Sequence, residues 1–237
     1  MAISKRVGCV AALWRYPVKS MAGEALEHAE VSWHGVPGDR RWAFIRKGKV
    51  TSGFPWLTIR EHPDLGRYRP SFVQPDLPDK SRTIVLTPAG SELDVVAPAL
   101  AAELGDGVGV IRNDRGFFDT LPLSMLTTQT LAALSTLVGA ALDVRRFRPN
   151  LLIESSSAAP FREDTWVGRV LRIGALRLRI DKRDQRCVTV NVDPVTARRS
   201  PAVLRAIARE RDACLGVYGS TVKPGRVAVG DPVVIES

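Results

Sequence analysis

Few cysteines, few histidines and no long apolar segment occur in this sequence, and each shortage excludes a class of protein. The three cysteines among its 237 residues, at positions 9, 187 and 214, form no C-x-x-C pair, which argues against a disulfide framework or a cysteine-based zinc site. The three histidines lack the spacing of metal ligands. No apolar run approaches the roughly 20 residues that cross a bilayer, and the first residues lack the pattern of a signal peptide. We therefore expect a cytoplasmic protein with no membrane partner.

Acidic residues are also scarce, with 25 Asp and Glu against 34 Lys and Arg, for a formal net charge of +9. This excess suits a polyanionic partner such as nucleic acid, a membrane surface or a phosphorylated cofactor. A generally basic surface would give the same count, so the charge alone does not decide. Nucleic-acid binding is disfavoured because the chain shows neither a known binding motif nor basic residues interleaved with aromatic ones.

Short apolar segments between Gly and Pro turns predict a mostly β protein of the α+β class. Helices are expected at 98–104, after Thr127 or Thr128, and from Ser200-Pro201 to about Cys214. The architecture expected is a β-barrel-like core with appended helices, divided near the turn-rich segment 113–122 into regions 1–120 and 121–237. The expected strands are 7–14, 29–34, 42–46, 83–87, 92–96, 108–112, 144–153, 170–173, 176–180, 187–192 and two short strands within 222–236.

Four segments combine hydroxyl, amide or basic side chains with a turn or a helix start, as an anion site requires. They are Tyr16-Pro17-Val18-Lys19-Ser20, Gly38-Asp39-Arg40-Arg41, Thr127-Thr128-Gln129-Thr130 and Arg145-Arg146-Phe147-Arg148-Pro149-Asn150. A helix start offers free N–H groups and the positive end of the helix dipole. Each segment taken singly is also explained by a turn, a helix cap or a solvated basic face.

Cys187 is the fifth feature, because it follows the charged run 181–186 and begins the apolar segment CVTVNV. Neighbouring cations lower the pKa of a thiol, and the thiolate is the form that binds soft metals or attacks electrophiles. No second Cys or His lies nearby in the sequence, so one thiolate would suit a covalent catalyst or a metal already held by an organic ligand. From its chemistry alone, Cys187 remains open between a buried core thiol and a functional one.

Two sets of motifs resemble a known family and together span nearly the whole chain. The string LWRYPVKSMAGEAL…GVPGDRRWAFI resembles the N-terminal β domain that precedes a MOSC domain, and FRPNLLIE…QRCVTVNVDP…PGRVAVGDPVVI resembles the MOSC domain itself. The resemblance implies a β-barrel MOSC core over 121–237 and an N-terminal β domain over 1–120. The most similar class comprises the amidoxime-reducing component and its bacterial relatives, which bind molybdopterin and reduce N-hydroxylated compounds.

The resemblance implies a role for each matching residue. Cys187 would be the ligand to molybdenum, and Asp193, near the metal, would handle protons. The positions implied to hold the cofactor are Lys19, Ser20, Arg40, Thr127, Thr128, Thr130, Arg148 and Asn150. The cofactor is molybdenum bound to molybdopterin, and the substrate is a small molecule.

The chain also departs from some relatives. It lacks the cysteines of an iron–sulfur domain, so we expect electrons from a separate protein of the ferredoxin, flavoprotein or cytochrome type. It lacks a pyridoxal-dependent desulfurase domain and the membrane-anchor segment of the mitochondrial relatives. The segment VTARRS after Asp193-Pro194 is more basic than the usual family turn. An alternative hypothesis is a non-enzymatic carrier of the cofactor, or a sulfur-transfer adaptor that uses Cys187 as a persulfide.

Overall fold

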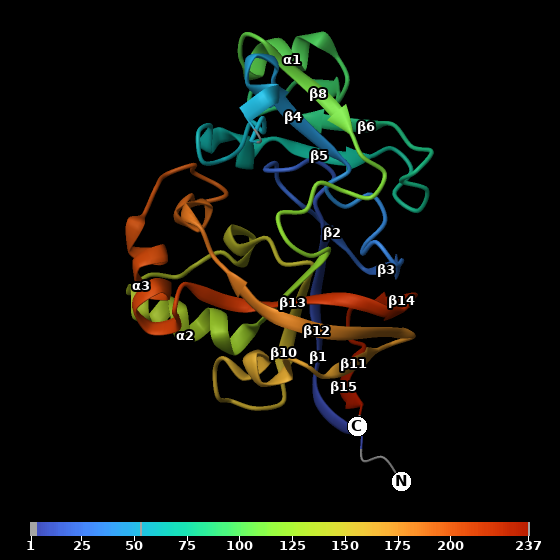
Figure 1. The fold of residues 1–237 in the computed structure, drawn as a ribbon, viewed down its shortest axis with the longest axis vertical. Helices are drawn as coiled ribbons and strands as arrows, with labels where there is room; N and C mark the ends of the chain where they lie inside the picture. The colour runs from blue at the N-terminus through green and yellow to red at the C-terminus, as the bar shows by residue number, and fades with distance from the viewer. Residues whose placement is uncertain (1–3, 53, 237) are drawn as a thin grey trace.

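The computed structural model describes residues 4–52 and 54–236 (Figure 1). The helices are α1 (Pro98–Leu104), α2 (Thr128–Val138) and α3 (Pro201–Arg211), with shorter 3-10 helices η1 (Lys47–Ser52), η2 (Pro63–Arg67), η3 (Val144–Phe147), η4 (Arg162–Trp166) and η5 (Val188–Asn191). The strands are β1 (Lys5–Arg15), β2 (Glu24–Leu26), β3 (His28–Val31), β4 (Trp42–Arg46), β5 (Arg69–Phe72), β6 (Thr83–Leu86), β7 (Glu92–Asp94), β8 (Val108–Arg112), β9 (Leu123–Thr127), β10 (Leu151–Ser155), β11 (Val170–Ile173), β12 (Leu176–Gln185), β13 (Cys214–Lys223), β14 (Gly225–Ala228) and β15 (Pro232–Glu236). No helix of the described residues is long and apolar enough to cross a membrane.

A closed β-barrel occupies the lower half of the molecule in Figure 1. Its sheet has the strand order β10-β9-β13-β12-β11-β15-β1-β2, and an additional pairing of β1 with β10 closes the ring. Side chains along β12 alternate between buried and exposed over 176–180, as expected for a strand with one face in the core. The prediction of a mostly β protein with a barrel and appended helices is confirmed.

The first strand belongs to this barrel, although the rest of the ring comes from the second half of the chain. β1 pairs with β10, β15 and β2, and Val7, Val10 and Leu13 lie in the barrel core. The predicted boundary near residue 120 therefore does not separate two self-contained sheets. A fragment that begins after it would lack the strand that closes the ring.

The part of the first half from β4 to β8 forms a smaller layer above the barrel (Figure 1). It contains the β4–β8 pair, the β5-β6-β7 sheet and α1, around a second core that includes Phe44, Val85 and Leu100. Helices α2 and α3 pack on one side of the barrel over a third core that includes Leu134, Val203 and Ile207. The loops that join the upper layer to the barrel meet between the two.

Three elements predicted in the second half of the chain differ from those in the structure. Residues 187–192 were expected to form a strand but form η5, preceded by Cys187 as its N-cap residue. The expected strand 144–153 is the 3-10 helix η3 followed by β10, because Pro149 cannot donate to a ladder. Cys214 begins β13 rather than ending a helix. It pairs with Gln185 of β12, which runs five residues further than the predicted 176–180.

A cationic cavity between the barrel and the upper layer

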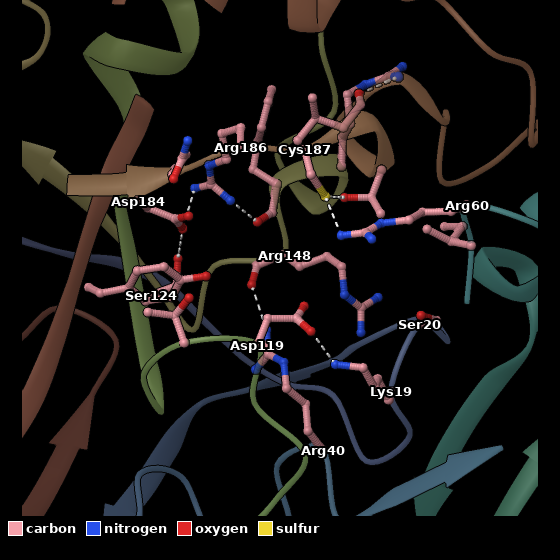
Figure 2. A pocket seen from close by; sticks show the side chains of 18 of the residues that line it. Lys19, Ser20, Arg40, Arg60, Asp119, Ser124, Arg148, Asp184, Arg186 and Cys187 are labelled. Carbon is pink, nitrogen blue, oxygen red and sulfur yellow. Dashed lines mark hydrogen bonds and ion pairs between the residues drawn. The ribbon is translucent and has the colours of Figure 1, made fainter. Parts of the chain in front are cut away.

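A cavity of about 460 Å³ lies where the loops of the upper layer meet the barrel (Figure 2). Its walls come from the segment after β1, the segment between η1 and η2, the loop before β9, η3, and the end of β12 with η5. Two carboxylates, Asp119 and Asp184, line it beside six cationic side chains. These are Lys19, Arg40, Arg60, Arg146, Arg148 and Arg186.

Arg40 and Arg148 are held against each other by Tyr16. Their guanidinium carbons lie 4.8 and 4.3 Å from the centre of the Tyr16 ring, and both residues adopt left-handed backbone conformations. Asp39 pairs with Arg40 and, against the effect of burial, raises its pKa. Among the residues that the structure describes, Arg148 pairs with no carboxylate, and burial together with the charge of Arg40 lowers its pKa to about 10. Its Nη2 atom is buried without a hydrogen-bond partner among the described residues. An anion in the cavity would therefore find an unsatisfied donor.

Asn150 supports this arrangement from outside the cavity. Its Nδ2 donates to the Asp39 carboxylate at 3.0 Å, and its Oδ1 accepts from the backbone N–H of Ser124 at 3.2 Å. The other oxygen of Asp39 accepts from the backbone N–H of Tyr16 at 2.7 Å. Asn150 is thus a buried link that orients Asp39 and, through it, Arg40, and it does not line the cavity.

Lys19 and Ser20 lie in the segment that follows β1, and both line the cavity. The Lys19 ammonium donates to the Asp119 carboxylate and to the carbonyl of Phe117 at 3.1 Å. Burial lowers the pKa of Lys19, although Asp119 opposes that effect. Ser20 has a φ of 68°, a left-handed conformation that turns the chain at the cavity wall.

The Cys187 thiol lies in the same cavity, where a residue from the first half of the chain contacts it (Figure 2). Nη2 of Arg60 donates to Sγ at 3.3 Å, and Sγ lies 3.2 Å from the hydroxyl oxygen of Thr189. Burial would raise the pKa of the thiol, but the hydrogen bonds from Thr189 and Arg60 outweigh it and hold the pKa below its ordinary value. The site therefore favours the thiolate, the form that binds soft metals.

The charged run before Cys187 does not supply that cation. Arg186 pairs with the buried Asp184 at 2.9 Å and donates to the carbonyls of Phe147 and Leu215. Ser124 donates to the same carboxylate at 2.9 Å. Burial raises the pKa of Asp184, against the effect of Arg186. The cation that contacts the thiol comes instead from position 60, which sequence reasoning missed because nothing local to Cys187 points to it.

No group of three or more His, Cys, Asp or Glu in the described part of the chain could hold a metal ion.

Comparison with known families agrees with this arrangement. A MOSC domain model matches residues 112–234, and a MOSC N-terminal beta barrel domain model matches residues 7–115. The chain belongs to the MOSC domain family.

Relatives of this MOSC chain include two mitochondrial proteins. It is 26% identical to mitochondrial amidoxime reducing component 2 of Bos taurus, over 97% of this chain and 83% of that protein. It is 24% identical to mitochondrial amidoxime-reducing component 1 of Homo sapiens, over 98% and 84% of the two chains. The crystal structure of the YUAD protein from Bacillus subtilis has the same fold, with a TM-score of 0.55 at 12% identity, over 100% of this chain and 99% of that one.

The helix-start threonines are not among the residues that line the cavity, and their predicted role in holding the cofactor stays a prediction. Thr127 and Thr130 are buried, and their hydroxyl groups donate to the Glu163 carboxylate at 2.9 Å. Thr127 also caps α2 by accepting from the N–H of Thr130. The Thr128 hydroxyl contacts Gln129. The Glu163 carboxylate from η4 therefore accepts the hydroxyl hydrogen bonds of Thr127 and Thr130 at the start of α2.

Asp193 also lies outside the cavity lining, and its surroundings do not suit a proton donor. One carboxylate oxygen accepts from the backbone N–H groups of Val195 and Thr196, and the other pairs with Arg146 at 2.9 Å. Burial alone would raise its pKa, but these hydrogen bonds and the Arg146 charge lower it. The proton-handling role of Asp193 stays a prediction, and the turn that holds the carboxylate favours its ionised form.

Proposed function

We propose that this chain binds molybdenum carried by molybdopterin in the cavity and reduces N-hydroxylated compounds there. The observation that carries the proposal is the buried, unpartnered Nη2 of Arg148 in a cavity that also holds the Cys187 thiol. A buried cation without a partner is unfavourable, so an anionic group bound beside Arg148 would be stabilised. The names of the relatives, amidoxime reducing components, support the substrate class.

The residues present fit such a group. The Cys187 sulfur would bind the molybdenum, because a thiolate is a soft ligand and its pKa is already depressed. The unpartnered donor of Arg148, with Arg40 beside it, would hold the anionic end, since charge-assisted hydrogen bonds to phosphate are strong. Lys19 and Ser20 would complete that wall. When bound, the molybdenum group supplies the electrons that reduce the N–O bond of the substrate.

The protein's own residues would bind the cofactor and orient it. Tyr16, Asp39 and Asn150 hold the two arginines from behind, so both side chains are already positioned at the cavity wall before any ligand arrives. Such preorganisation lowers the cost of ordering side chains on binding. Thr189 and Arg60 hold the thiol in the same way.

A turnover assay separates the reductase from a cofactor carrier or a sulfur-transfer adaptor. The protein is purified from cells with ample molybdenum cofactor and given benzamidoxime with a reduced viologen dye as electron donor. We expect formation of benzamidine, lost in Cys187→Ala and retained in Cys9→Ala, whose thiol lies on β1 outside the cavity. Bound molybdenum without turnover would favour the carrier, and neither binding nor turnover would overturn the proposal.

We further propose that electrons reach the site from a separate ferredoxin, flavoprotein or cytochrome, and that the protein works in the cytoplasm. Purified candidates of each class in place of the dye, together with cell fractionation, would test both statements. Recovery of the protein only in a mitochondrial fraction would contradict the cytoplasmic location. The names of the relatives describe those proteins as mitochondrial.

A further inference from the structure

Arg60 differs from the other cations of the cavity in its exposure and in its partners. Arg60 is exposed, whereas the other five cationic residues of the lining are buried or half-buried. Four of those five pair with a carboxylate: Lys19 with Asp119, Arg40 with Asp39, Arg146 with Asp193 and Arg186 with Asp184. Among the described residues, Arg60 and Arg148 alone of the six have no ion pair with a carboxylate.

The Arg60 guanidinium is also held in place at the mouth of the cavity. Its carbon lies 5.3 Å from the centre of the Phe54 ring, and Nη2 donates to Cys187 Sγ. The backbone carbonyl of Arg60 accepts from Nη2 of Arg199 at 2.6 Å, which ties the segment to the basic loop after Asp193. Arg60 therefore combines an exposed guanidinium, which has no ion pair with a carboxylate among the described residues, with a fixed position beside the thiol (Figure 2).

We propose that Arg60 binds the substrate and selects N-hydroxylated compounds that carry a carboxylate, an inference that rests on the proposed function for its substrate class. A guanidinium offers a planar pair of donors that matches a carboxylate. Any compound that reacts at a metal bound to Sγ must approach beside this group. The neighbouring Phe54 ring gives an apolar surface for the body of such a compound.

The cofactor itself is a second possible source of an anion for Arg60. Arg148, whose Nη2 is buried without a partner among the described residues, is the residue that we assign to the anion of the cofactor. Arg60, in contrast, is exposed. Because Arg60 also donates to Cys187 Sγ, its substitution should lower the molybdenum and pterin content, but by much less than Cys187→Ala does. A loss of cofactor as large as that in Cys187→Ala would assign Arg60 to the cofactor and overturn the proposal.

The first arm of the test needs no cofactor. The full chain is purified from cells that make no molybdopterin, and the alkylation rates of Cys187 by iodoacetate, an anion, and iodoacetamide, its neutral analogue, are measured by peptide mass spectrometry. Because the same thiolate attacks both reagents, the ratio of the two rates is independent of the thiol pKa. Arg60→Gln should lower the iodoacetate-to-iodoacetamide ratio about fivefold or more. Arg205→Gln, which removes an exposed arginine on α3, should leave it unchanged.

The second arm uses the loaded enzyme with benzamidoxime and 4-carboxybenzamidoxime. Wild type should show the lower KM for the carboxylated compound, and Arg60→Gln should remove that preference, measured as the ratio of the two KM values within each protein. Arg60→Lys should keep part of the preference. An unchanged alkylation ratio or an unchanged KM ratio in Arg60→Gln would overturn the proposal. If the loaded protein reduces neither compound, the reductase function fails, and the alkylation ratio still decides whether Arg60 recognises anions.

Discussion

The Arg40 guanidinium donates a hydrogen bond to the backbone carbonyl of Arg148 at 3.1 Å, and both guanidinium groups lie over the Tyr16 ring. Asp39 neutralises Arg40, whereas Arg148 pairs with no carboxylate in the described part of the chain. The fold therefore holds one uncompensated positive charge at the inner wall, at some cost to its stability. A bound anion would remove that cost, which couples ligand binding to the stability of the chain.

Arg148→Met tests whether that charge serves binding rather than folding. Breaking a buried ion pair costs about 3 to 5 kcal/mol, but Arg148 has no such pair to break. We expect the unfolding free energy of the cofactor-free protein to change by less than about 1 kcal/mol, while cofactor content falls about tenfold. Chemical denaturation and pterin analysis measure the two quantities, with Arg205→Met as the control. A large loss of stability with normal cofactor content would contradict this account.

Asn150→Ala separates a structural role from direct contact with the cofactor. The substitution removes the donor to Asp39 and leaves the backbone N–H of Ser124 without its acceptor. Because these groups are buried, we expect a loss of about 2 to 3 kcal/mol in the unfolding free energy of the cofactor-free chain. Asn113→Ala, in an exposed turn, should cost much less. Wild-type stability in Asn150→Ala, combined with loss of cofactor, would support direct contact instead.

Thr127→Val tests the role of the threonines at the start of α2. The change keeps the shape of the side chain but removes the helix cap and one hydroxyl bonded to Glu163. We expect a loss of about 1 to 2 kcal/mol in stability with unchanged cofactor content per folded molecule. Thr128→Val, which removes a hydroxyl that contacts Gln129, is the matched control. Selective loss of cofactor in Thr127→Val would support the phosphate role predicted from the sequence.

Asp193→Asn has an expected pH dependence. The folded pKa of Asp193 lies below its unfolded value of about 3.9, so its ionised form adds stability above that pH. That contribution is lost as the pH falls through the folded pKa. We expect Asp193→Asn to unfold more easily by about 1 kcal/mol at neutral pH, with the difference shrinking below about pH 4. Denaturation at several pH values measures it, and Asp212→Asn, at a 91% exposed side chain, should show little change. A difference that grows as the pH falls would contradict the assignment.

The sequence predicted those parts of the fold whose signals are local. The helix 98–104 and the strands 42–46, 108–112 and 170–173 have the bounds expected from their apolar patterns and flanking turns. Residues 187–192 have the composition of a strand, but β12 already pairs with β13 up to Gln185, and the chain turns into η5 beyond that point. Local propensity was overridden by the position of the chain relative to the sheet.

Residues of the cavity that belong to a sequence motif could be predicted, whereas a residue that only the fold brings there could not. Lys19, Ser20, Arg40, Arg148 and Cys187 line one cavity, as the motifs indicated. Arg60 reaches Cys187 across 127 positions of sequence, and no spacing rule connects them. The sequence could not show the partner of the threonines, because the Glu163 carboxylate that accepts their hydroxyl hydrogen bonds lies at least 33 residues further along the chain. Glu163 lies within the FREDTW segment, so a buried acid in that motif was the available signal.

The central claim is that Cys187 binds molybdenum carried by molybdopterin. Its most direct test is the molybdenum and pterin content of wild type and Cys187→Ala, both purified from cells with ample cofactor, with Cys9→Ala as the control. The account predicts near-stoichiometric molybdenum and pterin in wild type and Cys9→Ala, and loss of molybdenum in a folded Cys187→Ala protein. Wild type that holds no molybdenum, or Cys187→Ala that holds it as firmly as wild type, would contradict the claim.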